Sequence, residues 1–196
     1  LPRESDAALY THAGPEIAVA STKAFLAQIT AAYLLGLYLA QLRGNKYKDE
    51  IASILAELQN MPAKIQKVID NDTQVKELGV EMKDASSVIF LGRHVGFPVA
   101  MEGALKLKEI TYIHAEGFAA GELKHGPIAL IDEGQPVIVV VPSANGRDSL
   151  HGKVVSNIQE VRARGAFTIV IAEEGDEAVK PYADRLITVP ACPSLL

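Results

Sequence analysis

Cysteine and tryptophan are nearly absent from this chain. Its 196 residues include one cysteine, Cys192, and no tryptophan. A single thiol can form neither an internal disulfide nor a thiolate metal cluster, which favours a reducing compartment and predicts a cytoplasmic protein. The sequence also lacks HExxH, CxxC and paired-histidine spacings, so it implies no metal.

An excess of positive charge is absent as well. The chain has 19 Lys and Arg against 24 Asp and Glu, a formal net charge of −5. Nucleic-acid and anionic-membrane surfaces are usually basic, so we expect neither partner. An acidic protein that binds an anionic substrate must do so through a local group of residues.

One long stretch lacks charge altogether. Between Lys23 and Arg43 lie the nineteen residues AFLAQITAAYLLGLYLAQL, which is long enough for a transmembrane helix. Gln28, Thr30 and Gln41 interrupt it, and no aromatic belt flanks both ends. We predict a helix buried between packed layers, with a membrane span as the alternative.

Short β-branched runs alternate with helical patterns in the second half of the chain. The runs are VIFLG (88–92), VIVVV (137–141), TIVIA (168–172) and RLITV (185–189). Helical patterns from about Phe97 to Ile113 and over 149–164 separate them, which is typical of a parallel sheet with helices on both faces. The predicted fold class is α/β. Residues 45–85 read as helical, with Pro62 as a break or a first-turn residue.

Charged residues recur at helical spacing in the predicted helix 97–113. Glu102, Lys106 and Glu109 fall on one side, and the opposite stripe is apolar: Ala100, Gly103, Ala104, Leu107 and Ile110. The charges are either an exposed ion-pair ladder or a carboxylate base with a cation that steadies developing negative charge. Periodicity alone leaves both interpretations open.

A dense group of titratable residues follows this helix. ITYIHAEGFAAGELKHGP (110–127) contains His114, Glu116, Glu122, Lys124 and His125 among three glycines. A histidine in front of Gly-Pro lies where a helix should stop, exposed and free to titrate near neutrality. The group favours proton-transfer chemistry over a structural linker.

Two further segments have both a structural and a functional interpretation. LGRHVG (91–96) follows a strand and precedes a helix, a geometry that binds phosphate, but it lacks the full glycine fingerprint. In VASTKAF (19–25), Ser21 and Thr22 stand at the start of the long helix. Their hydroxyls either cap the helix or contact an oxyanion or a sugar hydroxyl.

These motifs together resemble a known family. GPEIAVASTKAF, EGALKLKEITYIHAEGFAAGELKHGP and SNIQEVRARGA are similar to the isomerase part of the glutamine:fructose-6-phosphate aminotransferases, which is built from two sugar isomerase (SIS) domains. The resemblance implies three-layer, flavodoxin-like αβα domains with parallel sheets. It places the end of a first SIS domain at 1–44, a helical connection at 45–85 and a second SIS domain at 86–196.

The resemblance also implies a role for each of five residues. Glu109 would move a proton between C1 and C2 of the sugar imine, and Lys106 would help to manage the proton on the C1 oxygen. His125 would assist ring opening from the neighbouring subunit of a homodimer. Val19 and Ser21 would line the sugar pocket. The substrate and product would be fructose 6-phosphate and glucosamine 6-phosphate, in the first step of hexosamine and cell-wall precursor synthesis, with no cofactor.

The resemblance further implies parts that lie outside these 196 residues. The family's phosphate cradle and glutaminase domain lie upstream, and an active-site lysine lies downstream. We therefore expect the chain alone to be inactive or nearly so. Two alternatives remain: a phosphosugar-sensing SIS module without catalysis, and a deaminase or isomerase that uses free ammonia.

Overall fold

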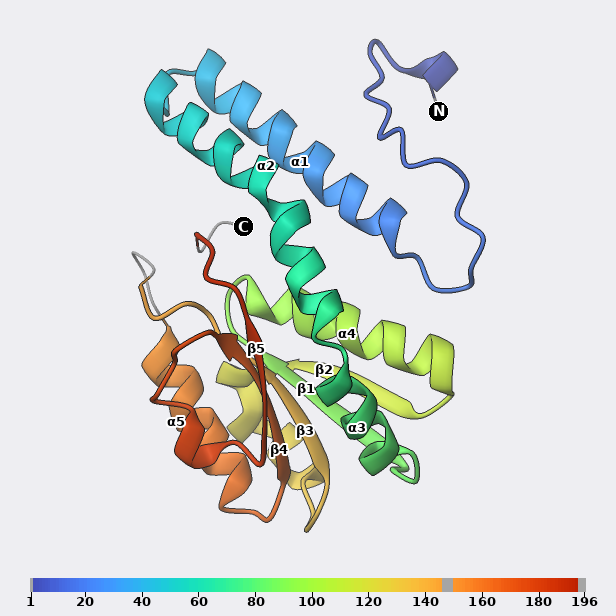
Figure 1. Ribbon diagram of the computed structural model, residues 1–196, viewed down its shortest axis with the longest axis vertical. Coiled ribbons are helices and arrows are strands. Elements are labelled where there is room, and N and C mark those ends of the chain that lie inside the picture. The colour runs from blue at the N-terminus through green and yellow to red at the C-terminus, as the bar shows by residue number, and fades with distance from the viewer. Residues whose placement is uncertain (1, 146–149, 194–196) are drawn as a thin grey trace. The chain divides into compact units, whose positions relative to one another are not determined.

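The computed structural model describes residues 2–145 and 150–193. Its helices and strands are, in chain order, α1 (Lys23–Leu42), α2 (Lys48–Asp70), α3 (Thr73–Met82), β1 (Ser87–Gly92), α4 (Gly96–Thr111), β2 (His114–Ala119), β3 (Pro136–Val140), α5 (His151–Arg162), β4 (Phe167–Glu173) and β5 (Arg185–Val189) (Figure 1). Short 3₁₀ helices are η1 (Pro2–Glu4), η2 (Ala120–His125), η3 (Pro127–Leu130) and η4 (Lys180–Tyr182).

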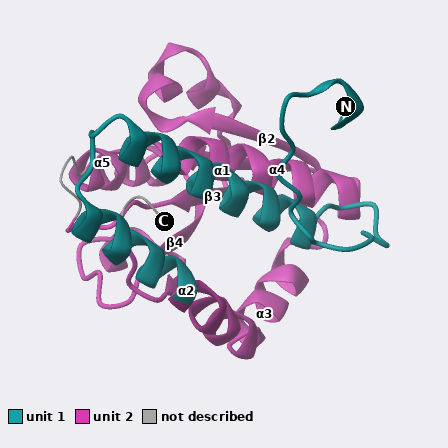
Figure 2. Cartoon of the chain, turned by 90° about the horizontal axis from the view of Figure 1, so that it is seen from above, with its two compact units in different colours: residues 1–59 teal, residues 60–196 magenta. Residues whose placement is uncertain are grey.

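The chain divides into two compact units, Leu1–Gln59 and Asn60–Leu196, which Figure 2 draws in separate colours. The boundary falls inside α2. That helix also runs through Pro62, so the predicted break at this proline is wrong. A proline removes one backbone hydrogen bond of the ladder, and the other bonds of this 23-residue helix keep it continuous.

Helix α1 of the first unit is apolar around most of its circumference. Of its side chains only Leu37 is buried, whereas Leu35, Tyr38 and Leu42 are more than half exposed. The predicted burial between packed layers is therefore not found within the described residues. The helix is long and apolar enough to cross a membrane by length and composition, but one such helix is weak evidence, since the core helices of soluble proteins share these properties.

The second unit contains a five-stranded sheet in the order β2-β1-β3-β4-β5, with every pairing parallel. This confirms the predicted α/β class. Four of the strands coincide with the β-branched runs. The edge strand β2 was not predicted. Its sequence HAEGFA lacks β-branched residues and contains two titratable residues, His114 and Glu116.

Helices cover both faces of this sheet, so the unit has three layers (Figure 1). One core lies under α5 and η2, where Leu91, Val139 and Ile158 are buried. The other lies under α3 and α4, where Phe90, Ala104 and Met82 pack. Side chains alternate between the two cores along each strand, as the pleat requires. All central strands are buried on both faces, which explains their unbroken apolar runs.

Candidate active site

Helix α4 carries the charged residues on the face turned away from the sheet. Ala100 and Ala104 are fully buried against the strands, and Glu102, Lys106 and Glu109 lie on the opposite side of a helix with 3.6 residues per turn. The prediction of this face is confirmed by their mutual contacts.

One residue of the predicted packed stripe on α4 is misplaced. Ile110 is 65% exposed, not packed on the sheet. It follows Ala104 by six residues, which puts it about 120° around the helix from Ala104. The apolar stripe is therefore narrower than the periodicity suggested.

The three charged side chains of α4 form one group. Lys106 Nζ donates to Glu109 Oε2 at 2.8 Å and lies 3.3 Å from Glu102 Oε1. Glu102, Lys106 and Glu109 are 25%, 23% and 29% exposed. An ordinary surface pair such as Lys76–Asp72 on α3 is 74% and 50% exposed. Partial exclusion of water strengthens the attraction between the α4 charges relative to such a pair.

These contacts favour the charged form of the lysine. The hydrogen bond to Glu109 raises the pKa of Lys106, partial burial opposes the rise, and Glu102 adds to it. The side chain therefore remains an ammonium next to a carboxylate. Such a pair can accept a proton at one atom while it stabilises negative charge a few ångströms away.

Strand β2 holds α4 in place. A Cβ on Gly117 would lie 2.7 Å from the Cα of Met101, so strand and helix meet backbone to backbone, an approach that only glycine permits. Gly117 therefore serves close packing between β2 and α4. The position of the charged face of α4 depends on this contact.

His125 lies at the end of η2, which leaves β2 at the carboxyl edge of the sheet. Its side chain is 74% exposed, with Nε2 4.0 Å from Glu122. Glu109 lies two residues before α4 ends, beside the start of β2. At 3.3 Å per residue, the start of β2 beside Glu109 and the end of β2, where η2 begins, are about 17 Å apart. The fold of one chain thus brings Lys106 to Glu109 but does not bring His125 to them.

A chain of polar contacts holds η2 against α5. Lys124 Nζ lies 2.9 Å from Glu160 Oε1, and Asn157 donates to Glu160 Oε2 at 3.4 Å. Arg93 Nε donates to Asn157 Oδ1 at 3.2 Å, and its guanidinium packs against Gly121. The buried Asn157 therefore links the loop after β1 to η2 and α5. Sequence reasoning missed this residue, because an asparagine in a polar helix carries no signal of burial.

The LGRHVG segment forms the turn from β1 into α4. A Cβ on Gly92 would collide with the carbonyl oxygen of Gly96, so the tight turn requires glycine there. The turn lies where the direction of the sheet order reverses, because the chain passes from β1 to β2 on one side and then from β2 back across β1 to β3 on the other. Open α/β sheets bind ligands outside the carboxyl ends of strands at this point. Phosphate binding by this turn stays a prediction.

In the first unit, Glu16 rather than a hydroxyl caps α1. Glu16 accepts hydrogen bonds from the backbone N–H of Ala24 at 2.9 Å and from the hydroxyls of Ser21 at 3.5 Å and Thr22 at 3.2 Å. Thr22 makes no side-chain cap bond, so the predicted hydroxyl cap is wrong. The carboxylate supplies the negative charge that a helix N-terminus favours. Val19 is 88% exposed.

The same contacts act on the charge of Glu16. The hydrogen bond from Ala24 lowers its pKa, partial burial opposes this, and Thr22 and Lys23 lower it further. Ser21 thus donates to a carboxylate whose charged form these contacts favour. Sequence reasoning missed Glu16, because it stands outside the helix that it caps.

Other kinds of site are less developed. Within 2–145 and 150–193, no group of three or more His, Cys, Asp or Glu is arranged to hold a metal ion. A shallow pocket of about 650 Å³ lies at the amino ends of the strands, and its lining includes Met82, Ser87, Gln135, Phe167 and Arg185. None of the five predicted site residues lines it.

Comparison with known families places this geometry in context. The family model of the SIS domain matches residues 81–194, which is 114 of the 196 residues and includes the whole sheet. The chain belongs to the SIS domain family. The α4 group and η2 therefore lie within the part of the chain that matches the SIS domain.

Relatives extend the similarity over the whole chain. Glutamine--fructose-6-phosphate aminotransferase (isomerizing) of Corynebacterium glutamicum is 76% identical over 196 residues, covering 100% of this chain and 32% of its own length. The Mycobacterium tuberculosis protein of that name is 64% identical over 196 residues, covering 31% of its own length. The chain thus spans about a third of the length of the curated relatives it matches.

A solved structure gives the same result for the fold. The C-terminal domain of glucosamine-fructose-6-phosphate aminotransferase from Francisella tularensis superposes with a TM-score of 0.88 at 43% identity, covering 97% of this chain and 53% of that one. These findings confirm the resemblance drawn from the motifs and the SIS fold. The roles of individual site residues stay predictions.

Proposed function

We propose that this chain is the isomerase part of an enzyme that makes glucosamine 6-phosphate from fructose 6-phosphate and glutamine-derived ammonia. The observation that carries the proposal is the contact between Lys106 and Glu109, at 2.8 Å on a shielded face of α4. The family supports it, since relatives that are 76% and 64% identical to this chain bear the name of that aminotransferase.

Glu109 is the proposed carbon base. Ammonia adds at C2 of the opened sugar, and loss of water gives an imine. Glu109 then takes a proton from C1, the C1–H electrons form a C1–C2 double bond, and the C=N electrons move to nitrogen, which is protonated. Return of the proton to C2 and loss of the C1 hydroxyl proton give the aldose. A carboxylate positioned by hydrogen bonding suits such a transfer.

Lys106 and His125 act on the oxygens in this proposal. The ammonium of Lys106 lies beside the C1 oxygen and steadies the negative charge that develops as the hydroxyl becomes a carbonyl. His125 transfers the proton that opens the sugar ring, as a general acid or base. Its 74% exposure and its distance from Glu109 along β2 support the idea that it serves the active site of a second copy.

Val19 and Ser21 line the sugar pocket in this proposal, with Ser21 oriented by Glu16. We assign 1–44 to the end of a first SIS domain, 45–85 to a helical connection and 86–196 to a second SIS domain. The family match over 81–194 supports the last assignment. Helices α2 and α3 occupy most of 45–85.

The wider setting is proposed on the same basis. The parent enzyme is a cytoplasmic homodimer whose glutaminase domain supplies ammonia, and it performs the first step toward UDP-N-acetylglucosamine and cell-wall precursors. No redox or metal cofactor is needed, because ring opening, imine formation and proton transfer involve no net oxidation of the protein or an added group.

The test is exchange of the C1 proton of fructose 6-phosphate with solvent deuterium, in a protein of the relatives' full length that contains this chain. Glu109→Gln should abolish exchange while sugar binding is retained. Glu177→Gln is the matched control, because Glu177 also forms an i,i+3 pair with a lysine, Lys180, at 2.6 Å. Undiminished exchange in Glu109→Gln would show that the α4 charges form only a structural ion-pair ladder.

The wild-type protein separates the alternatives in the same assay. Sugar binding with no exchange would identify a sensing module. Exchange with glucosamine formation from free ammonia but not from glutamine would identify an ammonia-dependent enzyme. Formation of glucosamine 6-phosphate from glutamine supports the proposal.

A further inference from the structure

Lys106 has two carboxylate partners, and the proposed mechanism uses only one of them. Glu109 Oε2 lies 2.8 Å from Nζ on one side, and Glu102 Oε1 lies 3.3 Å away on the other. The two glutamates are seven residues apart, so their Cα atoms are about 10.5 Å apart along the helix axis. Lys106 bridges them, and only one of the two can reach a given substrate carbon.

The charge of this group changes during the proposed reaction. With both glutamates ionised and the lysine protonated, its net charge is −1. When Glu109 holds the carbon proton, it becomes a neutral acid and loses most of its attraction for the ammonium. Glu102 is then the remaining anion in contact with Nζ.

We infer that Glu102 is a positioning residue that keeps the ammonium of Lys106 in place while Glu109 carries the substrate proton. This inference rests on the function proposed above. Without Glu102, the ammonium would lose the second of its two carboxylate partners at that stage, and its long side chain would be free to leave the C1 oxygen.

The geometry of the group favours this role over simple helix stabilisation. Exposed i,i+4 pairs contribute only a few tenths of a kcal/mol, and this triad is about three-quarters shielded. The pKa of Lys106 is consistent with this role, because both carboxylates raise it. A ladder that only stabilised α4 would have no need of a shielded face.

The experiment compares Glu102→Gln with the wild type in the full-length protein. kcat and KM for fructose 6-phosphate are measured across neutral and alkaline pH, and Lys106 is titrated by NMR of labelled lysine. We expect kcat to fall on the order of tenfold with little change in KM. Both the lysine titration and the alkaline limb of kcat should move to lower pH. Glu102→Asp, which keeps the charge, should restore most of kcat.

Asp72→Asn on α3 is the control for loss of a helical i,i+4 pair, because Asp72 lies 2.6 Å from Lys76 on an exposed face. It should leave kcat and its pH profile unchanged. A wild-type kcat profile in Glu102→Gln, or a Glu102→Asp protein as impaired as Glu102→Gln, overturns the inference. If Glu102→Gln does not fold, the Glu102→Asp profile alone decides, since a charged partner should preserve the alkaline limb.

Failure of the proposed function gives a different result. Glu109→Gln, assayed in parallel, would then keep C1 exchange. In that case both the proposed function and the role of Glu102 would be wrong. If Glu109→Gln loses exchange while Glu102→Gln behaves as wild type, only the role of Glu102 is wrong.

Discussion

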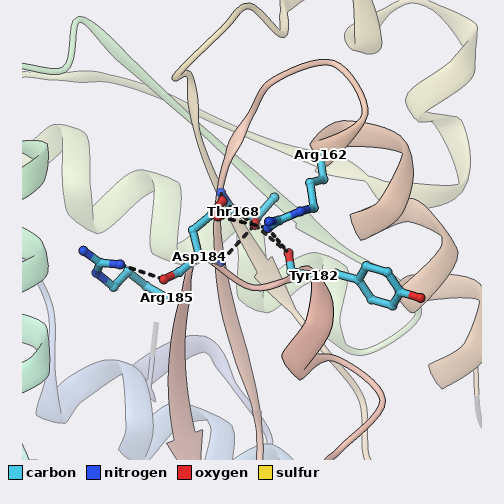
Figure 3. Close-up of polar contacts among 5 residues, drawn as sticks. All are labelled: Arg162, Thr168, Tyr182, Asp184 and Arg185. Atoms are coloured by element: carbon cyan, nitrogen blue, oxygen red, sulfur yellow. Dashed lines mark hydrogen bonds and ion pairs between the residues drawn. The ribbon is translucent and has the colours of Figure 1, made fainter.

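Asp184 and Thr168 are joined at the start of β5 and β4 by a compact set of hydrogen bonds (Figure 3). Asp184 Oδ2 accepts the backbone N–H of Thr168 at 2.8 Å, and the Thr168 hydroxyl oxygen lies 2.8 Å from the same atom. Arg162 at the end of α5 donates to Oδ1 at 2.9 Å. Thr168 is fully buried, so Asp184 satisfies polar groups that water cannot reach.

Replacement of Asp184 by asparagine should destabilise the second unit in a pH-dependent way. Burial raises the pKa of Asp184, but hydrogen bonds from Thr168 and the charge of Arg162 outweigh it, so the pKa lies below its ordinary value. The carboxylate's contribution is therefore complete above the unfolded-state pKa and is lost as pH falls through the folded-state pKa. We expect Asp184→Asn to lower the free energy of unfolding by about 1–3 kcal/mol at neutral pH.

Urea denaturation at neutral pH and at about pH 3 measures this loss. The difference between wild type and Asp184→Asn should shrink at the acidic value. Asp72→Asn, which removes an exposed carboxylate, should have a smaller effect at neutral pH. A difference that is as large in acid as at neutrality would show that the shape of the residue, not its charge, is responsible.

Gly117→Ala should destabilise the packing of α4 on β2. The added methyl would lie 2.7 Å from Met101 Cα and 2.9 Å from its backbone nitrogen, and neither backbone atom can move independently of the helix. We expect a loss of about 1–3 kcal/mol in unfolding free energy, as in other overpacked cores. Gly152→Ala in α5 is the control, because an added Cβ there meets nothing within 4 Å. Equal melting temperatures for the two variants would contradict the close approach.

Much of the sheet could be predicted from the sequence, and the reason is visible in the strands themselves. β3 and β4 are buried on both faces and contain the β-branched runs VIVV and TIVI, a pattern that needs no tertiary information. Strand β2 could not be predicted in this way. Its residues pair with β1 alone, so the edge position, which only the tertiary structure reveals, accounts for its polar composition.

The candidate site likewise contains contacts that local sequence spacing predicts and contacts that depend on the tertiary structure. The contact of Lys106 with Glu109 follows from a spacing of three on a helix, which the sequence contains. The separation of His125 from that pair depends on the length and direction of β2, which was not predicted. Glu16 and Asn157 form hydrogen bonds with residues that are 8 and 64 positions away in the sequence. No local sequence pattern predicts such contacts.

Asn157→Ala should loosen η2 and slow the step assigned to His125. The change leaves Arg93 without its acceptor at 3.2 Å and Glu160 without a donor at 3.4 Å, at a position only 5% exposed. We expect unfolding free energy to fall by about 1–3 kcal/mol and amide hydrogen exchange to accelerate over 120–130. Gln159→Ala, two residues along α5 at an exposed position, should change neither. Exchange over 120–130 that remains at the wild-type rate in Asn157→Ala would show that η2 is held by its apolar contacts, Ala120 and Leu123, rather than by the polar chain.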